Sequence, residues 1–255
     1  MQRLPKECGV FPPMAAVGEE ARRKDDPGVA YAAATHIAEA LIPLGINLDF
    51  APVLDVNTNP FNPIIGNRAF GADPEFVATL AVEFLRGLKD GGIIACGKHF
   101  PGHGDTDADS HLDLPLLNHT RRRFEACEWT PFRVAIAAGV PMIMTAHLMA
   151  PNLDPAHPAT ISHYITTRVL RGELGFAGVV VTDDLNMAGI ARQMPIEDAA
   201  VKAVQAGADI VLICKDIALQ RKAIDAMKAA LAKGTLSSDR ITQSLNRIRN
   251  LTSPS

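Results

Sequence analysis

Short apolar segments alternate with amphipathic segments along most of the sequence. Strands are predicted at residues 46–54, 93–98, 141–147, 178–184 and 208–214. Helices are predicted at residues 26–41, 74–90, 120–138, 162–171, 196–205, 216–232 and 238–250, and residues 1–26 are predicted to be irregular. Parallel strands need long crossover connections, which are usually helices. The alternation therefore predicts parallel strands in βα units, the α/β class.

Polar and titratable residues gather where each predicted strand ends. They are Asp55, Lys98–His99, His147, Asp183–Asp184 and Lys215–Asp216. A (β/α) barrel places its active site at this rim, and a doubly wound open sheet also binds ligands at strand ends. No Gly-x-Gly-x-x-Gly or Gly-Lys-Ser/Thr loop follows any of these strands, which favours the barrel. We therefore predict one domain of the (β/α)8 TIM-barrel type over residues 1–255.

The number of strands does not complete such a barrel. The sequence predicts five strands, whereas a closed barrel of this type has eight. Five βα units cannot close and would leave exposed parallel edges. We expect an incomplete barrel that lacks its N-terminal units, rather than three further strands within residues 1–45.

Composition narrows the class of protein. The formal net charge is −3 and no basic tract is present, which argues against nucleic acid as a partner. No apolar run reaches the roughly 18 residues of a membrane helix, and the N-terminus has no apolar core of a secretory signal. The four cysteines are scattered, and Cys96 and Cys214 lie in apolar runs as expected of core residues. A cytoplasmic enzyme without a membrane partner fits these observations.

The segment from Lys98 to His111 concentrates titratable groups. It reads Lys-His-Phe-Pro-Gly-His-Gly-Asp-Thr-Asp-Ala-Asp-Ser-His and directly follows an apolar strand. Buried charges are costly unless paired, so this composition is typical of a catalytic loop rather than of a core. Within it, Asp109 can accept a hydrogen bond from the His111 imidazole, which would raise the pKa of His111 and fix its tautomer for proton transfer. A solvated loop histidine is the alternative.

Other candidates lie at the ends of strands or in the loop that follows one. Asp183 ends an apolar strand, which predicts a carboxylate at the mouth of the barrel, although a helix cap or a loop salt bridge is equally compatible. Asp184 is expected to cap the following turn. Lys98, His99 and Arg68 can donate hydrogen bonds to ligand hydroxyls. The alternative for Arg68 is a surface salt bridge.

The acidic and histidine residues suggest two kinds of metal site. Asp105, Asp107 and Asp109 alternate as in a calcium loop, but Ser110 stands at the position of the required glycine and Leu116 at that of the required glutamate, which excludes this type. A metal-dependent barrel hydrolase stays open as an alternative, with the ligands drawn from four histidines: His99, His103, His111 and His147.

Two stretches together resemble family 3 glycoside hydrolases. They are Lys98–Thr106 with Asp109-Ser110-His111, and Val181–Met187, and the nearest group is the bacterial β-N-acetylglucosaminidases of the NagZ type. The resemblance extends over essentially the whole chain. It implies a retaining double displacement in which Asp183 is the nucleophile, His111 the general acid/base and Asp109 its partner. It also implies sugar binding by Arg3, Arg68, Lys98 and His99, with no metal and no organic cofactor.

The implied substrate is a small muropeptide of cell-wall recycling, from which β-linked GlcNAc is removed from anhydro-N-acetylmuramic acid. Members of the family carry three further βα units and an Asp-Gln-Glu-Gly-Gly-Arg segment before the position of Gln2-Arg3. The resemblance therefore also implies a chain that lacks the N-terminal part of the barrel. The expected state is a monomer or a homodimer. An inactive remnant that only binds sugar is the remaining alternative.

Overall fold

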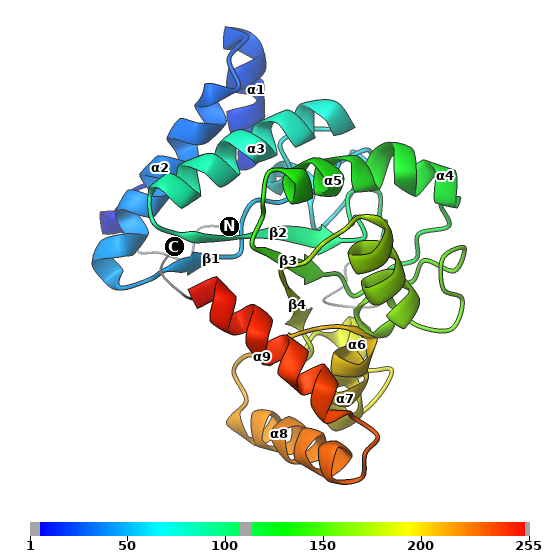
Figure 1. The fold of residues 1–255 in the computed structure, drawn as a ribbon. Helices are drawn as coiled ribbons and strands as arrows, with labels where there is room; N and C mark the ends of the chain where they lie inside the picture. Colours follow the sequence, from blue (N-terminus) through cyan, green and yellow to red (C-terminus); the bar gives the residue numbers. More distant parts are fainter. Residues whose placement is uncertain (1–5, 108–113, 253–255) are drawn as a thin grey trace. The chain divides into compact units, whose positions relative to one another are not determined.

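The computed structural model describes residues 6–107 and 114–252, which divide into two compact units (Figure 1). The first unit contains the chain up to residue 105 and residues 122–142. The second unit contains residues 106–121 and the chain from residue 143 onward. Each unit combines short strands with helices. No helix of the described residues is long and apolar enough to cross a membrane.

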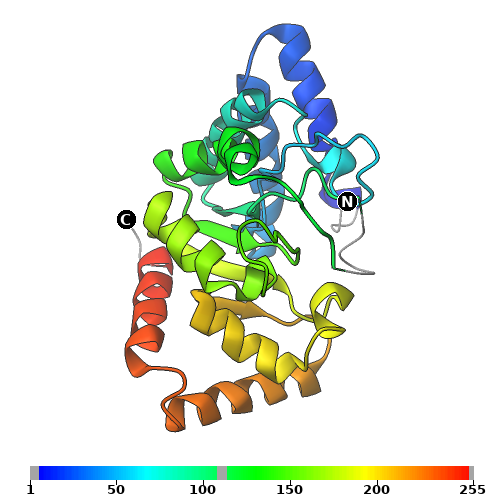
Figure 2. The ribbon, with the colours of Figure 1, turned by 90° about the vertical axis from the view of Figure 1, so that its right-hand side faces the viewer.

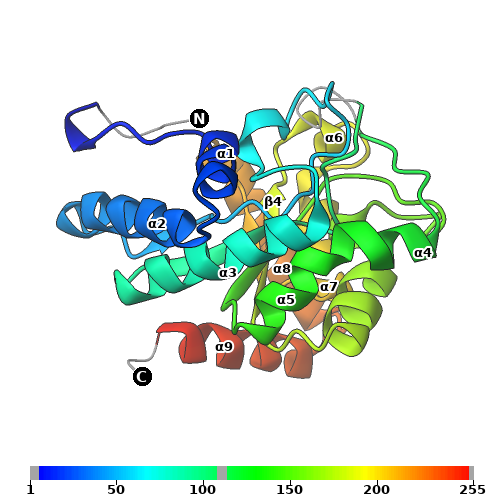
Figure 3. The same cartoon turned by 90° about the horizontal axis from the view of Figure 1, so that it is seen from above.

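The first unit packs helices against two parallel strands. The strands are β1 (Leu48–Asp49) and β2 (Ile94–Phe100), with Leu48 opposite Ile94 and Asp49 opposite Ala95. Figure 3 shows three of the helices side by side, α2, α3 and α5. The helices are α1 (Met14–Lys24), α2 (Gly28–Leu41), α3 (Pro74–Asp90) and α5 (Trp129–Ala137), and the short α4 (Arg121–Arg123) lies at the boundary of the units.

Helix α3 forms where its end signals predict it. The Asp73 side chain accepts a hydrogen bond of 2.7 Å from the Phe76 amide, and Pro74 occupies the first helical position. One face of the helix is buried, including Leu80, Phe84 and Leu88. Burial of this face anchors α3 and thereby fixes the start of β2 four residues after the helix ends.

The second unit contains the remaining strands. They are β3 (Met142–Thr145, whose first residue belongs to the first unit), β4 (Val179–Asp184) and β5 (Ile210–Leu212), in this order. β4 and β5 are parallel, with Val181 opposite Ile210 and an irregularity before Asp184. The helical elements are a 3₁₀ turn (Ala159–Ile161), a π-helical segment (Tyr164–Glu173), α6 (Ala188–Ala191), α7 (Ile196–Ala206), α8 (Ile217–Ala232) and α9 (Ser238–Thr252). Figure 2 shows α8, in orange, beside α7.

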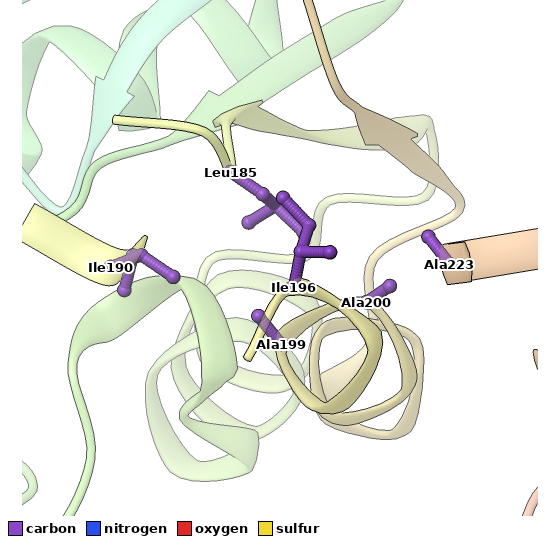
Figure 4. Packing of buried hydrophobic residues seen from close by; sticks show 6 residues of the cluster. All are labelled: Leu185, Ile190, Ile196, Ala199, Ala200 and Ala223. Carbon is purple, nitrogen blue, oxygen red and sulfur yellow. The ribbon is translucent and has the colours of Figure 1, made fainter. Parts of the chain in front are cut away.

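A buried apolar cluster lies directly after the end of β4. Figure 4 shows its members, which come from the segment after β4 and from α6, α7 and α8. The cluster consists of Leu185, Ile190, Ile196, Ala199, Ala200 and Ala223. Because Leu185 is fully buried in it, the chain is fixed one residue after the carboxylates that end β4.

The expected fold class is confirmed. The described residues contain five strands, β1 pairs in parallel with β2 and β4 with β5, and helices connect the strands. Five strands are part of the eight that close a TIM barrel, so the barrel is incomplete as expected. Cys96 is buried as predicted, whereas Cys214 is only half-buried.

The prediction that residues 1–26 are irregular is wrong, because α1 occupies Met14–Lys24. Gly18 weakens the helical pattern in the sequence. In the structure this glycine lets the helix lie against the backbone of Phe70, whose carbonyl oxygen would be 2.0 Å from a Cβ at Gly18. Tertiary packing therefore overrides the local signal.

Candidate active site

In the first unit, the fully buried Asp55 carboxylate organises the end of β2. Its Oδ1 accepts hydrogen bonds from the backbone amides of His99, at 3.2 Å, and His103, at 2.7 Å. Its Oδ2 lies 2.7 Å from Nδ1 of His99. Asp55 therefore holds both the His99 ring and the backbone of the loop that follows. In the sequence, Asp55 is recognisable only as a polar residue at a strand end.

The charge of Asp55 determines how the His99 ring is presented. Burial alone raises the pKa of Asp55, but its interactions with His99 and His103 outweigh burial and hold that pKa below its usual value. The ionised carboxylate only accepts, so Nδ1 of His99 carries a proton. Nε2 lies 3.4 Å from Nη2 of Arg68, and because a guanidinium only donates, Nε2 presents a lone pair. This lone pair faces the Arg68 guanidinium, and the expectation that His99 donates to a ligand hydroxyl stays a prediction.

Arg68 and His99, two of the predicted sugar-binding residues, are brought together. Arg68 ends a 3₁₀ turn (Gly66–Arg68) and its Nη1 donates to the Ile64 carbonyl at 3.1 Å. Within the described part of the chain Arg68 has no carboxylate partner, so it does not form the salt bridge that was the alternative. Its guanidinium is half-buried and directed at the His99 ring.

Lys98, the third of these residues that the structure describes, lies in β2 and is half-buried. Its ammonium acts on Asp49 in β1. Burial raises the pKa of Asp49 above its usual value, and the attraction of Lys98 offsets only part of this effect. Asp49 was not among the predicted site residues, because an acidic residue inside a short strand carries no distinctive local signal.

The loop after β2 is anchored close to its start. The Asn62 side chain donates to the His103 carbonyl at 2.8 Å, and Thr58 Oγ1 donates to Asp105 Oδ1 at 2.8 Å. Gly104 lies against the Val56 backbone, where a Cβ would be 1.9 Å from the carbonyl oxygen. The glycine is therefore required for this close approach, and the loop begins from a fixed position.

Three predicted site residues, Arg3, Asp109 and His111, lie outside the described residues. Their roles stay predictions.

In the second unit, two carboxylates stand at the end of β4. Thr182 is fully buried, whereas Asp183 and Asp184 are half-buried. Oδ1 of Asp183 accepts the amide of Asp184 at 2.8 Å. Oδ1 of Asp184 accepts the amides of Asn186 and Cys214, each at 3.0 Å. Asp184 therefore caps the following turn, as predicted, and also ties the ends of β4 and β5 together.

His147, two residues beyond β3, forms hydrogen bonds within the second unit. Its Nδ1 lies 2.7 Å from Thr160 Oγ1 and its Nε2 lies 3.0 Å from the Asp184 carbonyl oxygen. Both ring nitrogens are thus engaged with protein atoms, which is unlike a metal ligand. Among the described residues no group of three or more His, Cys, Asp or Glu side chains is arranged to hold a metal ion.

Comparison with known proteins places this geometry in context. Residues 1–251 match the sequence model described as the glycosyl hydrolase family 3 N-terminal domain. A β-hexosaminidase A of Pseudoalteromonas piscicida is 39% identical over 238 residues, covering 86% of this chain and 40% of the relative. A β-hexosaminidase of Neisseria meningitidis serogroup C is 41% identical over 218 residues, covering 84% of this chain and 60% of the relative. The chain thus spans about half the length of these relatives.

A solved structure of the same family is also similar to this chain. A glycoside hydrolase family 3 β-N-acetylglucosaminidase from Paenibacillus sp. str. FPU-7 superposes with a TM-score of 0.95 at 45% sequence identity. The superposition covers 98% of this chain and 47% of that chain.

Proposed function

Because the chain belongs to glycosyl hydrolase family 3, we propose that its site hydrolyses the bond to a β-linked N-acetylglucosamine at a non-reducing end. The names of the relatives support the sugar, since they are β-hexosaminidases and a β-N-acetylglucosaminidase. The observation that carries the proposal is the Asp183 carboxylate at the C-terminal end of β4, with one oxygen held by the Asp184 amide. In barrels of this type the catalytic groups stand at that end of the strands.

Asp183 is the nucleophile in the proposed mechanism. An amide hydrogen bond favours the anionic form of a carboxylate, which is the form that attacks. In the first step an Asp183 oxygen bonds to the anomeric carbon while the bond from that carbon to the leaving oxygen breaks. In the second step water attacks the same carbon and releases Asp183, so the sugar keeps its β configuration.

His111 supplies and recovers the proton. In the first step its imidazolium protonates the leaving oxygen, and in the second step the imidazole takes a proton from the attacking water. Asp109 accepts a hydrogen bond from the ring and fixes its tautomer. The mechanism requires no metal or organic cofactor.

The sugar is bound by four residues: Arg3, Arg68, Lys98 and His99. Arg68 and Lys98 donate to hydroxyl or amide oxygens, and His99 forms a further hydrogen bond with a sugar hydroxyl. Asp55 acts through His99 as a positioning residue. The proposed natural substrate is a muropeptide with GlcNAc on anhydro-N-acetylmuramic acid, processed in the cytoplasm by a monomer or homodimer. The sequence resemblance supports this finer assignment.

Hydrolysis of 4-nitrophenyl N-acetyl-β-D-glucosaminide tests the proposal. The chain is expected to release 4-nitrophenol, Asp183→Ala to lose this activity, and Asp225→Ala, at an exposed position of α8, to retain it. Equal turnover by the parent chain and by Asp183→Ala would remove Asp183 from the mechanism. Absence of turnover in the folded parent chain would contradict the proposed activity of this chain. Mass spectrometry of muropeptide digests then tests the finer substrate assignment.

A further inference from the structure

His147 reaches the backbone next to the proposed nucleophile. Its side chain is 1% exposed, and its Nε2 lies 3.0 Å from the carbonyl oxygen of Asp184. A carbonyl oxygen only accepts hydrogen bonds, so Nε2 carries a proton and donates it. The same oxygen accepts the amide of Met187 at 2.9 Å. The carbonyl of Asp184 is therefore held by two donors.

Thr160 fixes the His147 ring from the other side. Thr160 is fully buried, and its Oγ1 lies 2.7 Å from Nδ1 of His147. The hydroxyl also contacts the Ala146 carbonyl at 2.8 Å and Thr145 Oγ1 at 3.3 Å. With both nitrogens hydrogen-bonded in a closed environment, the ring has one orientation, and Nε2 is directed at the Asp184 carbonyl.

The Asp184 carbonyl belongs to the peptide unit that directly follows the one whose amide contacts the nucleophile. The amide of Asp184 donates to Oδ1 of Asp183 at 2.8 Å. Leu185 is fully buried in the cluster of Figure 4, and its amide donates to the Leu212 carbonyl at 2.9 Å. The direction of the Asp183 carboxylate thus depends on a backbone segment that His147 fixes on one side and β5 on the other.

We propose that His147 is a positioning residue for Asp183, which it orients through the backbone of Asp184. The inference rests on the proposed glycosidase function, in which an Asp183 oxygen must lie in line with the anomeric carbon. A misplacement of about 1 Å can reduce the rate of such a step about 100-fold, because the reacting atoms must be in contact and aligned. His147 touches no reacting atom and acts through the main chain alone.

Two substitutions separate the hydrogen bond from the shape of the side chain. His147→Phe keeps a planar ring but removes the donor, whereas His147→Gln keeps an N–H group at about the distance of Nε2. For 4-nitrophenyl N-acetyl-β-D-glucosaminide, His147→Phe is expected to lower kcat about 100-fold with little change in KM, since sugar binding is unaffected. His147→Gln is expected to recover most of the loss. His157→Phe, at an exposed histidine of the same unit, is the matched control and should behave like the parent.

A role in stability alone would give a different result. Each variant is first shown to be folded by circular dichroism, and its urea midpoint is measured. Parent-like kcat in folded His147→Phe overturns the inference. It is also overturned if His147→Phe and His147→Gln lose kcat equally and in proportion to the decrease in their urea midpoints.

Hydrogen exchange tests the same contact without activity. Amides 184–187 are expected to exchange faster in His147→Phe than in the parent or in His147→Gln, and unchanged exchange overturns the inference. If the folded parent shows no turnover, the proposed function fails, whereas hydrogen exchange still decides whether His147 fixes this segment.

Discussion

Replacement of Asp55 by asparagine tests how the first unit builds its part of the site. Asparagine has the same shape, and its oxygen can still accept the amides of His99 and His103. Its NH2 group, however, would face the protonated Nδ1 of His99 at a site where the present contact is 2.7 Å. If the proton moved to Nε2 of His99, the Nε2–H group would face the Arg68 guanidinium, whose Nη2 is 3.4 Å away. Either tautomer leaves two donors facing each other.

The expected loss in the free energy of unfolding can be worked out from these contacts. A buried hydrogen bond to a charged group contributes about 2 kcal/mol, and a buried donor left without a partner costs about 1–3 kcal/mol. We expect Asp55→Asn to lower the free energy of unfolding by about 3 kcal/mol. Urea unfolding followed by the fluorescence of Trp129 measures the change, because this single tryptophan is buried in the first unit.

The same substitution at an exposed carboxylate is the control. Asp73→Asn changes the cap of α3, where asparagine caps as well as aspartate, so its cost should stay below about 0.5 kcal/mol. The pKa of Asp55 is lower in the folded state, so its contribution is complete above the ordinary value of 3.8 and is lost as the pH falls through the folded value. The difference between parent and Asp55→Asn should therefore shrink in acid. A loss of less than about 1 kcal/mol in the free energy of unfolding of Asp55→Asn at pH 7 would refute the reasoning, as would a loss that stays the same in acid.

Three further predictions concern other buried groups. Asp209→Asn removes the charged partner of Arg171, Arg240 and Arg247, whose nitrogens lie 2.6, 3.0 and 3.1 Å from the Asp209 carboxylate. It should lower the free energy of unfolding by about 3–5 kcal/mol, measured by urea unfolding followed by circular dichroism. Gly104→Ala should cost about 1–3 kcal/mol, because its Cβ would lie 1.9 Å from the Val56 oxygen. Iodoacetamide at pH 8 should label Cys8 but not Cys127, since burial and the neighbouring Glu128 raise the pKa of the Cys127 thiol to about 11.

Matched changes control these experiments. Asp239→Asn, at an exposed position of α9, should change the free energy of unfolding by less than about 0.5 kcal/mol, and an equal effect of Asp209→Asn would contradict the role of its ion pairs. Gly172→Ala adds a Cβ whose nearest neighbour is 3.6 Å away, so a comparable loss there would show that close packing at Gly104 is not the cause. Mass spectrometry after digestion reports the cysteines, and similar labelling of both would contradict the protection of Cys127.

Periodicity in the sequence predicted all five strands and most helices, because those patterns depend on neighbours within a few residues. The first strand is shorter than predicted, with β1 limited to Leu48–Asp49. Helix α1 was missed because Gly18 interrupts its pattern, and only the contact with Phe70 explains the glycine.

For the site, the sequence placed Asp183 at a strand end and proposed Arg68 and His99 as sugar-binding residues. It could not show that Asp55 organises the loop after β2, because Asp55 and His99 are 44 positions apart. Nor could it show that His147 reaches the Asp184 carbonyl, 37 positions away. In both cases the local sequence offers only a polar residue after a strand.

The sequence by itself determined the alternation of strands and helices, the polar residues at the strand ends and the resemblance to family 3 glycoside hydrolases, since all three are local patterns of residue type. The tertiary structure decided which donor meets which acceptor: the proton on Nδ1 of His99, the hydrogen bond from His147 and the amide that holds Asp183. Such contacts act over about 3 Å between segments distant in the chain, and only folding brings those segments to that distance.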